Sequence, residues 1–432
     1  MNKNFKNLYN EFSLLSSIEK FFCCFPFFAI LGSAFVNLFY LVIIIFAIIQ
    51  FLKKNIRIKL SINIILFILI PYLIILSSYF LSDYKNFSSF MRSLLSFKFF
   101  ILPLIFLIFI KNKFFFKILS FNVAIIIFFL SFDLIFQYFV GYDIFGIKQE
   151  HPHRLSGFLG NEYVAGSFLS LFCVYFFLEF NQRINNFKNY TYLMLFFIFF
   201  LVVIAITGER LALLRYVFFS FFLFIFFLDT FKKKIISFII FFIVISNFFI
   251  FNHSFKVRVY EALFFAGIND KIIEFMPNYS GLKNNDLSNS PWFSHWKAAY
   301  FIFKDNKLSG VGLKNFREAC KESKYQKQNI LNQTGGSCTT HPHNLYMEIL
   351  SELGLIGIGY LFAIIIYFIH ILLNDYLKPY KRKYSLILAS IILFSLIPTL
   401  PAGSIFSSYN GGIHFFIIGS YLVLRKENRY EN

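Results

Sequence analysis

The residues best suited to chemistry are His341, His343 and Asn344, which stand directly before a long apolar run at 345–373. Pro342 favours the first turn of a helix, so His343 and Asn344 are predicted at a helix N-terminus. Such an end carries partial positive charge and free N–H donors, which attract anions and disfavour an imidazolium. His343 is therefore predicted to be neutral and able to accept a proton. This chemistry suits transfer from a phosphate-bearing donor to a hydroxyl group.

Arginines in the short connections between apolar runs could hold the phosphate of such a donor. The candidates are Arg154 and the last residue of the turn Gly208-Glu209-Arg210. A guanidinium fork can donate two hydrogen bonds to one phosphate group. Two alternatives remain open from the sequence: Arg210 could extend to the membrane surface, and Arg154 could pair with Glu150 or Glu162.

Three carboxylates in or beside apolar runs are costly there and need an explanation. Glu348 and Glu352 are four residues apart and share one face of a helix. We expect them to anchor neighbouring helices by hydrogen bonds rather than to catalyse. Asp133 is also expected to be a buried hydrogen-bonding residue. No Cys/His spacing matches a zinc site, so we expect no metal and no other cofactor.

These residues must be positioned by a membrane domain. The chain has 432 residues, of which 58% are hydrophobic and 22% aromatic. This composition predicts an all-α, polytopic membrane protein. About twelve transmembrane helices are expected, near 20–32, 33–52, 60–81, 91–110, 114–140, 157–179, 190–207, 210–229, 234–251, 345–373, 384–401 and 408–424. Residues 20–52 could instead form one bent element.

Lys and Arg gather in every second connection when the N-terminus is assigned to the cytoplasm, as the positive-inside rule requires. The net charge of +19 is therefore attributed to topology and not to nucleic-acid binding. The rule predicts an even number of spans, both termini in the cytoplasm and the polar segment 252–344 on the outer face.

The chain is thus expected to comprise transmembrane helices 1–9 in 1–251, an outer loop in 252–342 and transmembrane helices 10–12 in 343–432. The loop is too long to be a bare connector. An amphipathic helix is predicted at Trp292–Phe303 and a second, basic one at Asn315–Gln328. Cys320 and Cys338 both lie in the loop. They could form a disulfide worth about 3 kcal/mol or remain two thiols.

Five stretches, in this order, resemble the O-antigen ligases and related bacterial polysaccharide polymerases, over roughly residues 120–370. Each carries residue types that the family's motifs share. They are Phe132–Tyr138 with Gly141–Gly146, Arg154-Leu155-Ser156-Gly157 with Asn161, Thr207-Gly208-Glu209-Arg210, Trp296 with Gly310–Phe316, and His343-Asn344 followed by nine residues and Gly354-Leu355-Ile356-Gly357.

The resemblance implies a C-type glycosyltransferase-like fold and a metal-independent, inverting enzyme that takes a glycan from undecaprenyl pyrophosphate. It implies that His343 is the general base or its close partner. One departure is that the family often has an arginine shortly before the loop tryptophan, where this chain has Ser294-His295. Arg258 or His295 could take that role. The predicted substrate-binding residues are Arg154, Glu209, Arg210, Arg258, His341 and Asn344.

The expected function is transfer of the glycan to lipid A–core in lipopolysaccharide biosynthesis. The alternative within the fold is a polymerase that joins O-antigen or exopolysaccharide repeat units, and a polysaccharide transporter is a less favoured reading. The expected partners are the lipid-linked glycan, the lipid A–core or glycan acceptor and membrane lipid. The expected location is the bacterial inner membrane, with the site facing the periplasm.

Overall fold

The computed structural model describes residues 3–54, 62–160, 162–181, 187–265, 291–326, 338–376, 383–397 and 403–426. These residues form helices and one isolated bridge between Tyr142 and Lys148. The helices of the N-terminal part are α1 (Lys3–Ser13), α2 (Ser17–Cys23), α3 (Phe25–Ile30), α4 (Ser33–Lys54), α5 (Ile62–Leu81), α6 (Phe87–Leu95), α7 (Phe97–Phe109), α8 (Phe115–Val140), α9 (Ala165–Asn181), α10 (Phe187–Ile206), α11 (Arg210–Phe227) and α12 (Phe231–Phe251). They are followed by α13 (His253–Phe265), α14 (Pro291–Asp305), α15 (Phe316–Cys320), α16 (Ser323–Gln326), α17 (Leu345–Tyr376), α18 (Lys383–Leu396) and α19 (Ser408–Lys426).

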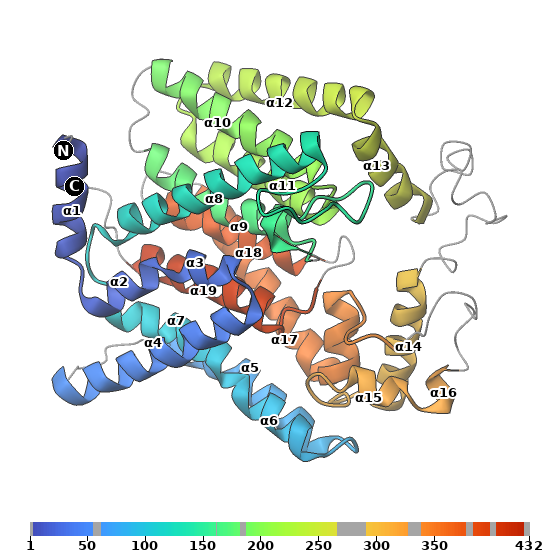
Figure 1. Cartoon of the computed structure of the whole chain (residues 1–432). Helices are drawn as coiled ribbons and strands as arrows, with labels where there is room; N and C mark the ends of the chain where they lie inside the picture. Colours follow the sequence, from blue (N-terminus) through green and yellow to red (C-terminus); the bar gives the residue numbers. More distant parts are fainter. Residues whose placement is uncertain are drawn as a thin grey trace.

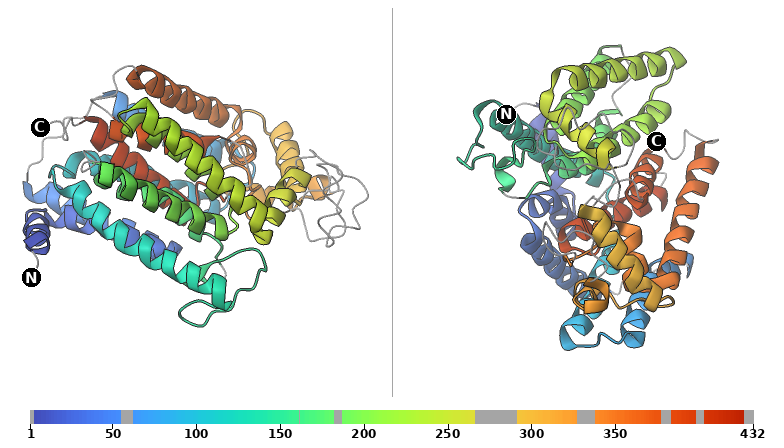
Figure 2. Two further views of the ribbon diagram at one scale, coloured as in Figure 1. Left: turned by 90° about the horizontal axis from the view of Figure 1, so that it is seen from above. Right: turned by 90° about the vertical axis from the view of Figure 1, so that its right-hand side faces the viewer.

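The long helices lie side by side in a bundle, as α8, α10 and α12 illustrate (Figure 2). At one end of the bundle is α1, and at the other end are α14, α15 and α16 (Figure 1). Among the described residues, seven helices are long and apolar enough to cross a membrane: α4, α5, α6 with α7, α8, α11, α12 and α17. Three shorter apolar helices lie at 165–179, 190–206 and 384–396. The chain is thus a helical, polytopic membrane protein, as predicted.

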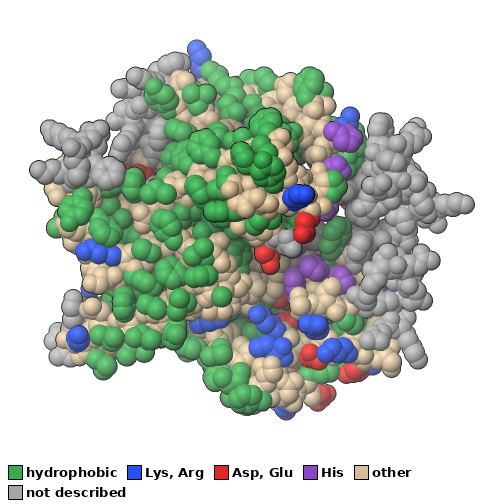
Figure 3. All heavy atoms as spheres, in the orientation of Figure 1, with side chains coloured by type: hydrophobic (Ala, Val, Ile, Leu, Met, Phe, Trp, Pro, Cys, Tyr) green, Lys and Arg blue, Asp and Glu red, His purple; other side chains and the backbone are tan. Residues whose placement is uncertain are grey.

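The outer surface of the bundle is suited to lipid. In the apolar stretch of α12 only 6% of the residues are buried inside the protein, and in that of α5 only 17% are buried. Both helices are apolar around their whole circumference, which is the pattern of a helix that contacts hydrocarbon instead of water. Hydrophobic side chains cover most of the visible face, whereas its histidines gather only toward the end near α13–α16 (Figure 3).

The expected spans at 20–32 and 157–179 begin or divide differently in the structure, and the expected span at 408–424 is not among the seven described helices that meet the length and apolarity of a span. The run at 20–32 is divided into α2 and α3, because Pro26 starts a new helix and Gly32 turns the chain with a φ of 98°. These two helices have 7 and 6 residues and together cover about 20 Å at 1.5 Å per residue, which is less than the membrane core. The run at 157–179 becomes α-helical only at Ala165, and before it Gly157–Leu159 form one turn of 3-10 helix.

The described parts of the polar segment contain the helices α13 to α16 and the loops at 306–315 and 338–344. The predicted amphipathic helix is confirmed as α14, whose Ala298, Ala299 and Ile302 pack with Val311 and Phe316 in a separate small core. The predicted second helix is divided into α15 and α16. Cys320 and Cys338 form a disulfide, so the segment that leads to His341 is tied to the end of α15.

Candidate active site

The loop that carries Arg154 is held by α8. Asp133 accepts hydrogen bonds from the backbone N–H groups of Ile144 (2.9 Å) and Phe158 (2.6 Å). The side-chain oxygen of Gln137 accepts from Ser156 and Gly157. Asp133 is therefore the buried hydrogen-bonding residue that the sequence predicted, and it positions the loop. Asn161 of the same motif lies outside the described residues.

Arg154 lies between Tyr163 and the turn Thr207-Gly208. Its guanidinium is 4.4 Å from the ring centre of Tyr163 and donates to the Tyr163 carbonyl at 3.1 Å. The next residue, Leu155, donates its N–H to the Thr207 carbonyl at 3.2 Å. A side chain on Gly208 would lie 2.2 Å from the His153 carbonyl oxygen, so only glycine permits this approach. Two motifs that lie about fifty residues apart therefore form one surface.

Glu209 is buried and faces α9. Its carboxylate accepts hydrogen bonds from the N–H groups of Gly166 (2.6 Å) and Ser167 (3.0 Å) and from the Ser167 hydroxyl (2.7 Å). A carboxylate at this position neutralises the free donors at the start of α9. The predicted substrate contact of Glu209 is not supported by this geometry, because both of its oxygens already bind α9.

Arg210 and Arg258 meet beside the same turn. Arg258 donates from Nε to the Gly208 carbonyl at 3.2 Å, and Arg210 donates to the Arg258 carbonyl at 3.4 Å. The guanidinium of Arg210 also lies 5.6 Å from the ring centre of Trp292 at the start of α14. The turn 207–210 thus gathers Arg154, Arg210 and Arg258 at one place.

The histidine segment lies at a break in the membrane helices. Gly354 interrupts α17 with φ 64° and ψ −157°, which leaves residues 345–353 as a short half-helix. The loop before α15 binds this break: Val311 and Gly312 donate to the Ser351 and Glu352 carbonyls, both at 2.9 Å. In the other direction, Leu355 donates to the Lys307 carbonyl at 2.8 Å and Ile356 to that of Leu308 at 3.3 Å. The Gly-x-Gly and Gly-x-x-Gly motifs therefore form one backbone joint.

Asn344 caps the half-helix. Its side-chain oxygen accepts from the N–H groups of Tyr346 (3.0 Å) and Met347 (3.2 Å). This bonding satisfies donors that the helix start leaves free. Because the amide oxygen is occupied, capping accounts for Asn344 without a substrate contact. Its helix-start position was predicted correctly.

His343 directly precedes this cap and has a φ of 54°, which is unusual for a residue with a side chain. Its ring centre lies 4.2 Å from that of His341 and 5.7 Å from that of His295 on α14. Burial lowers the pKa of His343, and the charge of His295 lowers it further. His343 is therefore neutral near pH 7, as predicted, although burial is the main cause.

Helix α14 joins the two groups of residues. Trp292 faces Arg210, and His295, three residues later and one helical turn on, faces His343. The sequence indicated His295 as a substitute for the missing arginine but did not single out Trp292 as a site residue. Its three-residue spacing to His295 was the available signal. In the described part of the chain, no three His, Cys, Asp or Glu side chains are arranged to hold a metal ion.

The two carboxylates of the half-helix are anchors. Glu352 accepts the N–H groups of Lys314 at 2.7 Å and Phe316 at 3.3 Å, and so holds the start of α15. Glu348 accepts a hydrogen bond from the hydroxyl of Ser404. Both residues are almost fully buried. Their predicted role in joining helices is confirmed by these contacts.

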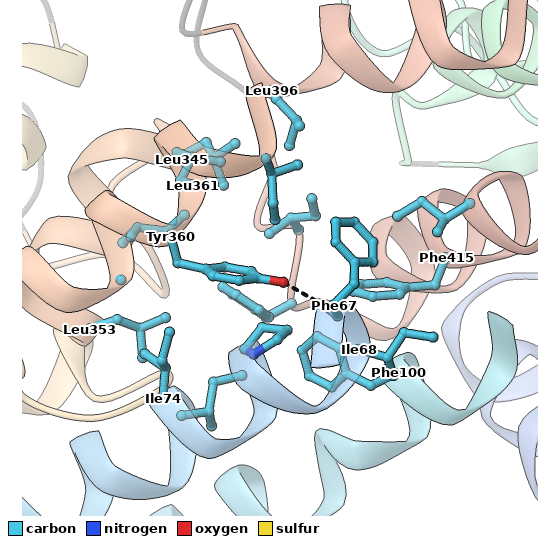
Figure 4. A pocket seen from close by; sticks show the side chains of 18 of the residues that line it. Phe67, Ile68, Ile74, Phe100, Leu345, Leu353, Tyr360, Leu361, Leu396 and Phe415 are labelled. Atoms are coloured by element: carbon cyan, nitrogen blue, oxygen red, sulfur yellow. Dashed lines mark hydrogen bonds between the residues drawn. The ribbon is translucent and has the colours of Figure 1, made fainter. Parts of the chain in front are cut away.

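Below the half-helix is an apolar pocket, lined by α5, α7, α17, α18 and α19 (Figure 4). Leu345 and Leu353 of the half-helix face it, together with Phe67 and Phe415. The hydroxyl of Tyr360 donates to the Phe67 carbonyl, so the polar group of this lining residue is satisfied. The pocket can therefore accept hydrocarbon.

The match to known families covers the centre of this arrangement. Residues 195–362 match a protein-family model described as O-antigen ligase. The matched range contains Arg210, Arg258, His295 and the stretch His341–Gly357, and begins after Arg154. No curated protein matches the chain. The comparison confirms the resemblance drawn from the motifs.

Proposed function

We propose that this protein transfers a glycan from undecaprenyl pyrophosphate to lipid A–core, because residues 195–362 match the O-antigen ligase family model. The observation that carries this proposal is the path of contacts from the arginines to the histidines. Arg210 packs on Trp292, and one helical turn later His295 packs on His343. A phosphate-binding group and a neutral base are thus joined by one helix.

In this mechanism the arginines bind the pyrophosphate. Arg154 is held by the Tyr163 carbonyl, Arg258 by the Gly208 carbonyl and Arg210 by the Arg258 carbonyl, so their charges are in place before the donor arrives. Fixed cations stabilise the negative charge that develops on the departing pyrophosphate. Their arrangement costs little reorganisation during the reaction.

His343 accepts the proton of the acceptor hydroxyl. The acceptor oxygen attacks the anomeric carbon from the face opposite the pyrophosphate, the bond from this carbon to the phosphate oxygen breaks, and the configuration inverts. Since His343 is neutral near pH 7, it can accept a proton at that pH. His341 lies beside it and contacts the substrate. Asn344 and Glu209 act as positioning residues through their caps on α17 and α9.

The hydrocarbon of a lipid substrate would lie in the apolar pocket of Figure 4. Leu345 and Leu353 of the half-helix line this pocket, and His343 directly precedes the same half-helix. Burying an isoprenoid or acyl chain there removes it from water without leaving a polar group unpaired. The same half-helix would thus connect the lipid and the reacting sugar.

The site would face the periplasm, with both termini in the cytoplasm. The disulfide between Cys320 and Cys338 supports this orientation, because such bonds persist in oxidising compartments. The helix α1 lies at the opposite end of the bundle from α14–α16 (Figure 1). Basic residues are also concentrated in the connections assigned to the cytoplasm.

The test is deletion of the gene, followed by complementation with the wild type, His343→Asn or His370→Asn. Asparagine tolerates the positive φ at position 343 and removes the base. His370 lies far along α17, is exposed and shares a hydrogen bond with Asn374 of the same helix, so its variant is a matched control. Surface glycans are separated on a gel, and lipid-linked chains are extracted.

We expect the wild type and His370→Asn to restore long-chain lipopolysaccharide, and His343→Asn to leave the chains on the lipid carrier. Decoration with single repeat units in the deletion strain would indicate the polymerase instead. Long-chain lipopolysaccharide at wild-type levels with His343→Asn would exclude His343 as the base.

A further inference from the structure

A large cavity lies beside the histidine segment and is not used by the mechanism above. Its volume is about 1020 Å³. His341 and Thr340 line one part of it, and the turn at 30–34 and the loop at 403–410 line others. This volume is sufficient for a sugar residue together with a charged group. Since His341 borders the cavity and contacts His343, a molecule in the cavity would lie next to the base.

Three cations form one wall of the cavity. Arg92 comes from α6, Lys314 from the loop before α15 and Arg317 from α15. Lys98 is close enough to Lys314 for their charges to repel. The carboxylates that line the cavity are Glu348, which binds Ser404, and Glu162 on the loop before α9.

Lys314 is held in a specific conformation. Its φ is 57°, and among the described residues only His343 is another non-glycine residue with a positive φ. Glu352 stabilises this conformation by accepting the Lys314 N–H at 2.7 Å. Strained backbone of this kind persists where the surroundings enforce it, often at functional sites. Burial also lowers the pKa of the Lys314 amine, so this cation has lost part of its hydration.

Arg92 is oriented by the same loop. Its guanidinium donates to the side-chain oxygen of Asn315 at 3.1 Å, and Asn315 in turn donates to the carbonyls of Tyr84 and Val311. The buried Nε of Arg92 has no hydrogen-bond partner in the part of the chain that the structure describes. A buried N–H donor of this kind gains free energy when an anion supplies the missing acceptor.

We propose that Arg92, Lys314 and Arg317 form an acceptor subsite, which binds a phosphate group of the acceptor lipid and places its sugar next to His343. This inference rests on the proposed function. The donor pyrophosphate would bind at the arginines around the turn 207–210, and the acceptor phosphate at this separate wall. Two sources have the required chemistry: the phosphates of lipid A and the pyrophosphate of a second lipid-linked glycan.

The test measures lipid binding without turnover, so that it stands apart from the test of glycan transfer. The detergent-purified full chain is titrated by native mass spectrometry with bisphosphorylated lipid A, dephosphorylated lipid A and undecaprenyl pyrophosphate. The variant is Lys314→Asn with Arg317→Gln, because asparagine accepts the positive φ at position 314. The control is Lys304→Gln with Lys307→Gln, which removes the same charge from exposed positions outside the cavity.

We expect the variant to bind bisphosphorylated lipid A at least about tenfold more weakly than the wild type, because charge-assisted hydrogen bonds are lost. The control should bind like the wild type, and the first equivalent of undecaprenyl pyrophosphate should be retained. Loss of only a second equivalent of undecaprenyl pyrophosphate would support the subsite and identify a lipid-linked glycan as the acceptor.

If the variant binds bisphosphorylated lipid A and undecaprenyl pyrophosphate as the wild type does, the proposal is overturned. If the double variant does not fold, the single variant Arg317→Gln decides, because Arg317 is exposed and its replacement leaves the core intact. Reduced lipid binding by that variant supports the subsite, and unchanged binding refutes it.

Discussion

Replacement of Gly354 by alanine tests the joint between the half-helix and the loop 307–312. With φ 64° and ψ −157°, Gly354 occupies a region that is essentially restricted to glycine. An added Cβ would lie 2.4 Å from the Leu308 carbonyl oxygen and 2.7 Å from that of Lys307. Backbone cannot move aside as easily as a side chain, so the joint must open.

The cost follows from two contributions. The backbone strain is about 1–3 kcal/mol. Two hydrogen bonds, from Leu355 to Lys307 and from Ile356 to Leu308, are lost at about 0.5–1.5 kcal/mol each. Gly354→Ala should therefore reduce the free energy of unfolding by about 2–6 kcal/mol, from these two principles together. Glycan transfer should also fall, because the half-helix that follows His343 shifts.

The assay is reversible unfolding in sodium dodecyl sulphate, with Gly359→Ala as the control. Gly359 lies in the same helix, and a Cβ there would meet nothing within 4 Å. Its replacement should be neutral or stabilise the protein by up to about 1 kcal/mol through helix propensity. Equal unfolding free energies for Gly354→Ala and Gly359→Ala would refute the reasoning about the joint.

Three further predictions concern the site. Replacing Cys320 and Cys338 by serine should remove about 3 kcal/mol of stability and slow transfer, because the disulfide holds the segment before the histidines; unfolding curves that match the wild type would contradict this. Since burial and His295 lower the pKa of His343, the neutral base persists below the ordinary value of about 6.5, so transfer should decline only at lower pH. In His295→Asn the decline should begin at a higher pH, and an unchanged profile would show that His295 has no influence. Arg210→Lys should raise the KM for the donor about tenfold, because a point charge replaces a fork, and an unchanged donor KM would argue against pyrophosphate binding there.

The sequence by itself determined the class of the protein and much of the site. Apolar runs of spanning length require helices in a membrane, because hydrocarbon cannot satisfy a free backbone. The amphipathic pattern of Trp292–Phe303 predicted α14. The order Pro342-His343-Asn344 before an apolar run predicted a helix start at the base. These features depend on residues that are close to one another in the chain, so the sequence is sufficient to predict them.

The tertiary structure alone decided which distant groups meet. The break at Gly354 exists because a loop from the polar segment supplies partners for the interrupted backbone of α17. Glu209 became a cap because the start of α9 lies against its turn, which no local pattern indicates. Likewise, Arg92 and Lys314 are separated by more than two hundred residues and share a cavity wall only because α6 packs against the loop before α15. Such pairings depend on how the chain packs. Residue types and spacing therefore identified the arginines and histidines as candidates, but they could not show which of them share a site.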